Sequence, residues 1–112
     1  MRFFAVIVAL CTLLSACGDK NGEQILFFTH DGCPYCEKAL QYINTNYDNL
    51  PMQILEVSKA QNMKRFIACA DKFKLDKRKL GTPLICMKDG YILGWSEMDA
   101  AKFRKLVKTY VK

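Results

Sequence analysis

Two cysteines separated by two residues, in Cys33-Pro34-Tyr35-Cys36, constrain this chain more than any other feature. An apolar run at residues 25–28 comes shortly before them and predicts a short buried strand. Residues 34–46 follow with the apolar spacing of a helix. The cysteine pair is therefore predicted to lie at a strand-to-helix turn, a position suited to thiol–disulfide exchange.

Cys33 is predicted to be the nucleophile, because it immediately precedes the first turn of the predicted helix. Unpaired backbone N–H groups and the positive end of the helix dipole stabilise a thiolate there. Cys36 lies one turn further on and is predicted to resolve a mixed disulfide at Cys33. Pro34 suits the first helical turn, where its missing N–H is not needed. We expect Tyr35 to be exposed and, with Pro34, to tune the redox potential.

The same two sulfur atoms have other interpretations, a structural disulfide or half of a metal site. A disulfide between residues i and i+3 closes a short loop and adds little stability. A zinc or copper site would need further ligands, for which Cys69, Cys86 and His30 are the candidates. We therefore predict redox chemistry, with no resident metal and no cofactor.

Three further residues leave alternatives open. His30 lies three residues before Cys33, and a cationic imidazole there would stabilise the thiolate; a solvated loop residue is an equal alternative. Cys69 lies in a predicted helix and Cys86 in a predicted strand. Two buried free thiols are favoured over a second disulfide, because helix-edge and strand positions need not face each other.

The rest of the chain alternates between strand and helix patterns. Strands are predicted at 25–29, 52–57, 84–87 and 91–93, and helices at 34–46, 59–73 and 97–111. The inner faces of the helices are predicted to carry Ala39, Leu40 and Ile43; Met63, Phe66, Ile67 and Ala70; and Phe103, Leu106, Val107 and Tyr110. An intervening helix implies that the first two strands are parallel, and the Lys88-Asp89-Gly90 turn implies an antiparallel hairpin. Ser96 can cap the last helix.

The N-terminus predicts export. A charged start, Met1-Arg2, precedes an apolar run at 3–14, which is short for a membrane span but suits a signal-peptide core. Leu14-Ser15-Ala16-Cys17 resembles the lipobox of bacterial lipoproteins. That resemblance implies removal of residues 1–16, lipidation of Cys17, a lipidated tether at 17–24 and a domain at 25–112. An uncleaved membrane anchor, or secretion with a free Cys17, is the alternative.

The chain is basic, with a formal charge of +6 that falls to +5 if Arg2 is removed. Such a charge could favour anionic lipids or acidic partners, but a solvated surface is the preferred interpretation. A solvated face is also the preferred interpretation of one basic cluster, which comprises Lys72, Lys74, Lys77, Arg78 and Lys79. The basic residues are not interleaved with aromatic residues in any nucleic-acid motif, so no nucleic-acid partner is predicted. Trp95 is expected to pack in the core or at its rim.

The predicted α/β order, with the dithiol at the first strand–helix turn and Thr82-Pro83 before the third strand, resembles the thioredoxin fold. The compact form and the Cys-Pro-Tyr-Cys sequence resemble glutaredoxin, and the resemblance covers residues 25–111. It implies a four-stranded mixed sheet flanked by three helices. It also implies that Pro83 is a cis-proline packed against the dithiol, leaving the Thr82 backbone free to bind an extended substrate.

The stretch Gly94-Trp95-Ser96-Glu97 departs from the Gly-Gly pair and acidic turn of glutaredoxins. Glutathione is therefore an uncertain partner, and the expected partners are protein thiols or disulfides, or a low-molecular-weight thiol. Together these features predict a monomeric thiol–disulfide oxidoreductase, lipid-anchored to the membrane of the bacterial cell envelope and facing the periplasm or extracytoplasmic space. An envelope metallochaperone that carries copper or zinc on the same two thiolates is the alternative.

Overall fold

The computed structural model of the chain describes residues 24–111, which form one sheet and the helices around it. The strands are β1 (Ile25–Thr29), β2 (Met52–Glu56), β3 (Leu84–Cys86) and β4 (Tyr91–Leu93). The α-helices in this part of the chain are α2 (Pro34–Asn46), α3 (Ala60–Lys72) and α4 (Glu97–Val107). A short 3-10 helix, η1 (Lys77–Lys79), lies between α3 and β3. The predicted order of strands and helices is confirmed.

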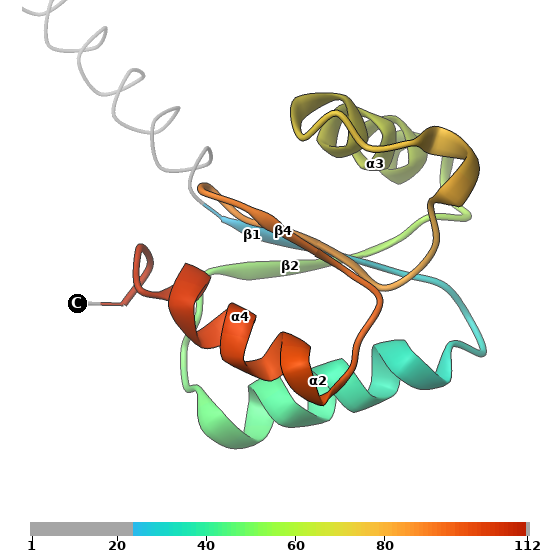
Figure 1. The fold of residues 1–112 in the computed structure, drawn as a ribbon. Coiled ribbons are helices and arrows are strands. Elements are labelled where there is room, and N and C mark those ends of the chain that lie inside the picture. Colours follow the sequence, from blue (N-terminus) through green and yellow to red (C-terminus); the bar gives the residue numbers. More distant parts are fainter. Residues whose placement is uncertain (1–23, 112) are drawn as a thin grey trace, which may run out of the picture.

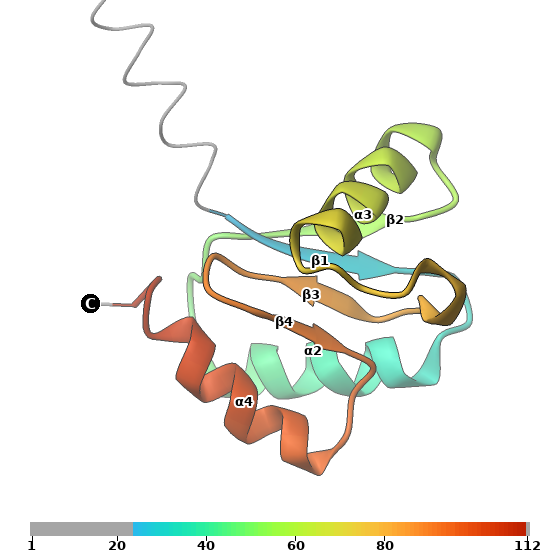
Figure 2. The same cartoon turned by 45° about the horizontal axis from the view of Figure 1, so that its top comes forward.

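The sheet has the strand order β2-β1-β3-β4. β1 pairs in parallel with β2 and antiparallel with β3, and β3 and β4 form the predicted antiparallel hairpin. The backbone N–H of Met87 closes that hairpin by donating to the carbonyl oxygen of Gly90 at 2.9 Å. Helix α3 covers one face of the sheet, while α2 and α4 cover the other (Figures 1 and 2). The fold class is therefore the mixed α/β sheet that the sequence predicts.

The two faces of the sheet support two separate apolar clusters. Successive strand residues point to opposite faces, so the fully buried neighbours Phe27 and Phe28 belong to different clusters. The cluster beneath α2 and α4 also contains Ile25, Ala39, Ile43, Ile85, Ile92, Phe103 and Val107. The cluster beneath α3 also contains Leu55, Val57, Phe66, Cys69, Leu84 and Cys86. The helix faces follow from the apolar spacing of each segment.

One predicted inner position and one predicted helix end are wrong. Helix α3 buries Phe66, Cys69 and Ala70, whereas Met63 is 40% exposed. The buried stripe of α3 is thus rotated toward Cys69 relative to the prediction. The last helix ends at Val107 rather than at 111, and Tyr110 lies beyond it, where its hydroxyl oxygen accepts from the N–H of Lys88 at 2.6 Å.

Helix α4 begins with the predicted cap at Ser96. The Ser96 N–H donates to a carboxylate oxygen of Asp99 at 2.7 Å, and the Ser96 hydroxyl donates to the same oxygen at 3.0 Å. This bonding satisfies a backbone donor at the start of the helix and places a negative charge near its positive dipole end. The cap therefore fixes the position of α4 directly after Trp95.

Candidate active site

The dithiol occupies the turn between β1 and α2. Cys33 is the N-cap residue of α2 with an extended backbone, and Pro34 occupies the first helical turn. Gly32 precedes them with a φ of +72°, in the left-handed region that side chains disfavour, so this sharp turn is best made by glycine. Cys33 and Cys36 form a disulfide with their Cα atoms 5.2 Å apart. The predicted pair therefore lies where exchange chemistry requires it.

The two sulfur atoms of this pair have different surroundings. Cys36 is 2% exposed, whereas Cys33 is only partly buried. The Cys33 Sγ accepts from the N–H of Cys36 at 3.2 Å and from the hydroxyl of Thr82 at 3.5 Å. Hydrogen bonds to a developing thiolate stabilise it, as does the helix N-terminus. Cys33 is therefore the sulfur atom that a substrate can reach, and it carries the groups that would stabilise its thiolate.

The Thr82-Pro83 segment lies beside this disulfide. Its peptide bond is cis, as the resemblance implied, and Pro83 is buried. The Thr82 carbonyl oxygen lies 3.6 Å from the Cys33 Sγ, and the Pro83 carbonyl accepts from the Gly94 N–H at 2.7 Å. The substrate-binding role of Thr82 and Pro83 stays a prediction. The hydrogen bond from the Thr82 hydroxyl to sulfur was missed, because the sequence suggested a role only for the Thr82 backbone.

The residues predicted to tune the site lie around its exposed side. Tyr35 is 56% exposed, as expected, and the Lys38 ammonium lies 5.7 Å from its ring centroid. His30 is exposed, and its Nδ1 lies 2.9 Å from the carbonyl oxygen of Asp31. This hydrogen bond holds the imidazole against its own loop backbone. The tuning roles of His30, Pro34 and Tyr35 stay predictions.

A groove of about 560 Å³ extends from Tyr35 between α2 and the start of α4. Tyr42 and Trp95 line its aromatic wall, with Ser96 and Glu97 at the start of α4. Trp95 also packs against Tyr42 and Phe103, at ring-centroid distances of 5.5 and 6.3 Å, so its predicted packing role is confirmed. Burial raises the pKa of the Tyr47 hydroxyl, and the neighbouring Tyr42 raises it further. The groove therefore combines an aromatic wall with the charged residues Lys38 and Glu97, and Tyr35 joins it to the Cys-x-x-Cys loop.

Cys69 and Cys86 form a second disulfide, so the prediction of two free thiols is wrong. Their Cα atoms are 6.4 Å apart, and the residues are 6% and 8% exposed. The rotation of α3 explains the difference, because it turns Cys69 onto the sheet face that carries Cys86. This bond joins α3 to β3 within the cluster beneath α3.

The basic cluster before Thr82 is exposed, and several of its members have polar partners. Lys77 pairs with Asp71 at 2.7 Å, and Arg78 pairs with Asp76 at 3.2 Å. Hydrogen bonds from Arg78 hold the pKa of the Asp76 carboxyl below its usual value. These contacts agree with the predicted solvated face.

Among residues 24–111, no three or more His, Cys, Asp or Glu residues gather in a group able to hold a metal ion. No helix in the same range is both long and apolar enough to cross a membrane. The predicted signal peptide at 1–16, the lipidation site at Cys17 and nearly all of the tether lie outside the described residues.

The architecture and the position of its dithiol define a thioredoxin-like α/β fold, the class that the sequence predicts. The chain is similar in structure to the crystal structure of a glutaredoxin from Archaeoglobus fulgidus, with a TM-score of 0.53. The match covers 77% of this chain and 87% of the glutaredoxin, at 16% sequence identity. No family model and no curated protein sequence matches the chain. The similarity therefore concerns the fold.

Proposed function

We propose that this chain is a thiol–disulfide oxidoreductase of the bacterial cell envelope, acting through Cys33 and Cys36. The observation that supports this most is the asymmetry of the pair. The partly exposed sulfur of Cys33 accepts two hydrogen bonds at a helix N-terminus, whereas Cys36 is buried behind it. A nucleophile needs access and a stabilised thiolate, and a resolving thiol needs only to reach the nucleophile.

In the reducing direction, the Cys33 thiolate attacks one sulfur of a substrate disulfide. The Cys33–substrate bond forms as the substrate S–S bond breaks, and one substrate thiolate leaves. The Cys36 thiolate then attacks the Cys33 Sγ, so that the Cys33–Cys36 disulfide forms and the second substrate thiolate leaves. Two electrons pass from the dithiol to the substrate, and the reverse sequence oxidises a substrate dithiol.

Residues around the dithiol activate Cys33 and provide contacts for a substrate. The Cys36 N–H and the Thr82 hydroxyl stabilise negative charge on Cys33, both as attacking and as leaving group. An extended substrate would pair with the Thr82 backbone, in the manner of strand addition. The groove from Tyr35 to Trp95 then offers its aromatic wall to a protein substrate. Protein disulfides are accordingly the favoured substrates, and the domain acts as a monomer without a resident cofactor.

Activity assays on two cysteine variants test the mechanism. Cys33→Ser is expected to abolish disulfide reduction, because no nucleophile remains. Cys36→Ser is expected to keep the first attack and accumulate a mixed disulfide, which non-reducing mass spectrometry detects at Cys33. Full activity of the Cys33→Ser variant contradicts the mechanism.

The envelope location is proposed from the lipobox-like sequence at Cys17. Expression in a bacterial host with labelled fatty acid tests it, with Cys17→Ser as the comparison. The proposal expects label and membrane association only with Cys17 present. An unlabelled protein that stays in the membrane fraction supports an uncleaved anchor instead, and an unlabelled protein in the soluble fraction supports simple secretion.

A further inference from the structure

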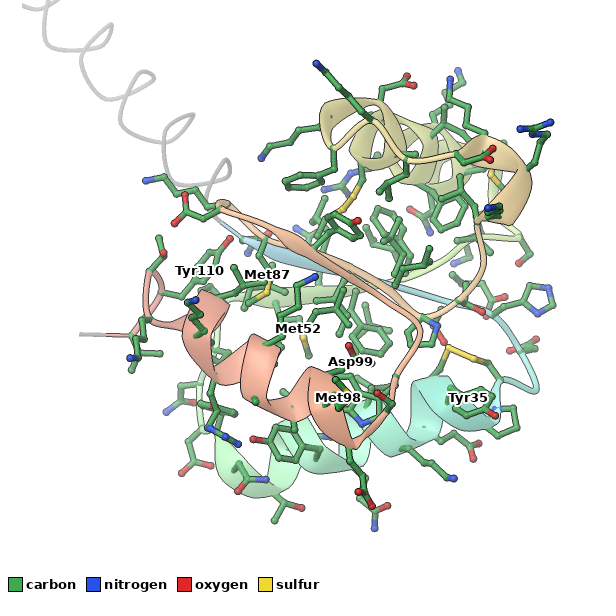
Figure 3. The ribbon with its side chains drawn as sticks, in the orientation of Figure 1. Tyr35, Met52, Met87, Met98, Asp99 and Tyr110 are labelled. Atoms are coloured by element: carbon green, nitrogen blue, oxygen red, sulfur yellow. A yellow bond between two sulfur atoms is a disulfide. The ribbon has the colours of Figure 1, made fainter. Side chains whose placement is uncertain are left out.

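A second cavity lies at the end of the sheet opposite the dithiol. It has a volume of about 310 Å³ and lies between α3, the start of β1 and the β3–β4 hairpin. In Figure 3 the labelled residues Met87 and Tyr110, which line this cavity, lie at the far end of the sheet from Tyr35, beside the dithiol. The proposed redox chemistry makes no use of this cavity.

The rim of the cavity is cationic. Arg65, Lys72 and Lys88 line it, and no acidic residue is among its described lining residues. The Arg65 Nη1 donates to the side-chain oxygen of Gln53 at 3.1 Å, and the Lys72 ammonium donates to the carbonyl oxygen of Lys88 at 3.4 Å. These bonds hold two of the cations at the rim. Asp89, the neighbour of Lys88 in the chain, does not line the cavity, and its carboxylate accepts from the Thr109 hydroxyl at 2.7 Å.

The floor of the cavity is apolar. It contains Leu26, Met87 and the buried Cys69–Cys86 disulfide, and the exposed Ala68 also lines the cavity. A hydrophilic anion such as free phosphate would use the rim but leave this floor unfilled. An amphiphile with an anionic group and an apolar portion would use both, since cations attract its charge and the floor buries its carbon atoms.

The position of the cavity relative to the chain indicates where such an amphiphile would come from. Gln24, the first described residue, lines the cavity, so the chain enters the domain at its edge. Residues 18–24 can span at most about 25 Å from the proposed lipid on Cys17. The cavity end of the domain would therefore lie against the membrane. The dithiol lies beyond the opposite end of β1. The five residues of β1 separate that end from the cavity by about 16 Å, at 3.3 Å per residue.

We infer that this cavity binds an anionic membrane phospholipid, with the charged headgroup at Arg65, Lys72 and Lys88 and the adjoining carbon atoms on the apolar floor. The bound headgroup orients the tethered domain with its dithiol directed away from the membrane. The inference rests on the proposed anchoring at Cys17 for the location of the domain, and it is independent of the redox chemistry.

Lysine labelling on vesicles tests this inference with the full chain. The protein is reconstituted into phosphatidylcholine vesicles with or without phosphatidylglycerol, and the acetylation rate of each lysine is followed by mass spectrometry. We expect Lys72 and Lys88 to react about fivefold more slowly on the anionic vesicles. Lys59 and Lys79, exposed lysines that do not line the cavity, serve as internal controls and should react at equal rates on both vesicles.

Two further arms identify the source of the anion and separate this inference from the proposed function. Free glycerol phosphate added to neutral vesicles should give no protection, and equal protection by it would overturn a membrane ligand. Equal rates on both vesicle types, or equal slowing of all four lysines, would also overturn the inference. The protection of Lys72 and Lys88 and the disulfide reductase activity are measured in parallel on an Arg65→Gln variant, which keeps both lysines. Loss of protection with retained activity supports the inference, whereas inactivity of the unaltered chain counts only against the proposed function.

Discussion

The two disulfides of this domain are the same covalent bond in two opposite settings. Cys33–Cys36 spans three positions at a helix N-terminus, and one of its sulfur atoms belongs to a partly exposed residue. Cys69–Cys86 spans 17 positions, joins α3 to β3, and belongs to two buried residues. The first closes a short loop beside hydrogen-bond donors, and the second closes a long loop within an apolar cluster.

This difference separates reactivity from stabilisation. Exchange requires an accessible sulfur and a stabilised leaving thiolate, which only the Cys33–Cys36 pair combines in the described part of the chain. Stabilisation by a disulfide grows with the length of the loop that it closes. We therefore propose exchange chemistry for the first disulfide and a bracing role for the second.

The largest expected effect is on activity. Cys33→Ser should lower the rate of disulfide reduction by at least about 1,000-fold, because the nucleophile is lost. The Cys69→Ser/Cys86→Ser variant should stay within a few-fold of the unaltered protein when assayed below its melting temperature. Initial rates with a peptide disulfide measure both. A comparable loss in the second variant would break the proposed division of roles.

Stability should show the opposite order. Replacing Cys69 and Cys86 by alanine should lower the free energy of unfolding by about 3 kcal/mol, as expected for a loop of this size. Replacing Cys33 and Cys36 by alanine should cost about 2 kcal/mol or less on the same scale. Urea denaturation of the oxidised proteins measures the two values. An equal or larger cost for the active-site pair would contradict the bracing role.

A smaller effect is expected from Thr82. The Thr82→Val change removes the hydroxyl donor to the Cys33 Sγ while nearly keeping the side-chain shape. A hydrogen bond of about 1 kcal/mol implies a roughly fivefold slower reaction of Cys33 with iodoacetamide at neutral pH. Thr45→Val, at an exposed position of α2, is the matched control and should leave that rate unchanged. Equal rates in all three reduced proteins would show that the hydroxyl does not stabilise the thiolate.

The smallest effect concerns Asp76, which lies between Cys69 and Thr82 in the chain. Arg78 lowers the pKa of this carboxyl in the folded protein. The carboxylate therefore contributes stability above its unfolded pKa, and that contribution is lost as the pH falls through the folded pKa. Asp76→Asn should lower the melting temperature slightly at pH 7 and not at pH 2. The same small decrease at both pH values would show that the ion pair is not its cause.

Local patterns predicted most of the fold because they depend on neighbouring residues. The Cys-x-x-Cys pair, the helix spacing around Ala39 and Ile43, the Asp89-Gly90 turn and the Ser96 cap each have a short-range physical cause. The arrangement of the candidate site was predicted equally far, since Cys33, Cys36 and the cis-proline segment lie together as expected, while their roles stay predictions.

Features that depend on how elements pack could not be predicted in this way. Helix α3 is rotated so that Met63 is exposed and Cys69 is buried. The sequence has an apolar stripe for this orientation and for the predicted one, so the pattern alone does not choose between them. The second disulfide follows from that rotation. The cationic rim likewise joins Arg65 and Lys72 of α3 to Lys88 of the hairpin, which are adjacent only once α3 packs on the sheet.

The central claim is that Cys33–Cys36 exchanges and Cys69–Cys86 does not. Differential alkylation during a titration of the oxidised protein with dithiothreitol tests it most directly, because mass spectrometry assigns each opened pair. The account predicts that Cys33 and Cys36 become alkylated first, while Cys69 and Cys86 remain paired until the fold is denatured. Opening of Cys69–Cys86 first, or of both pairs together in the folded protein, would contradict it.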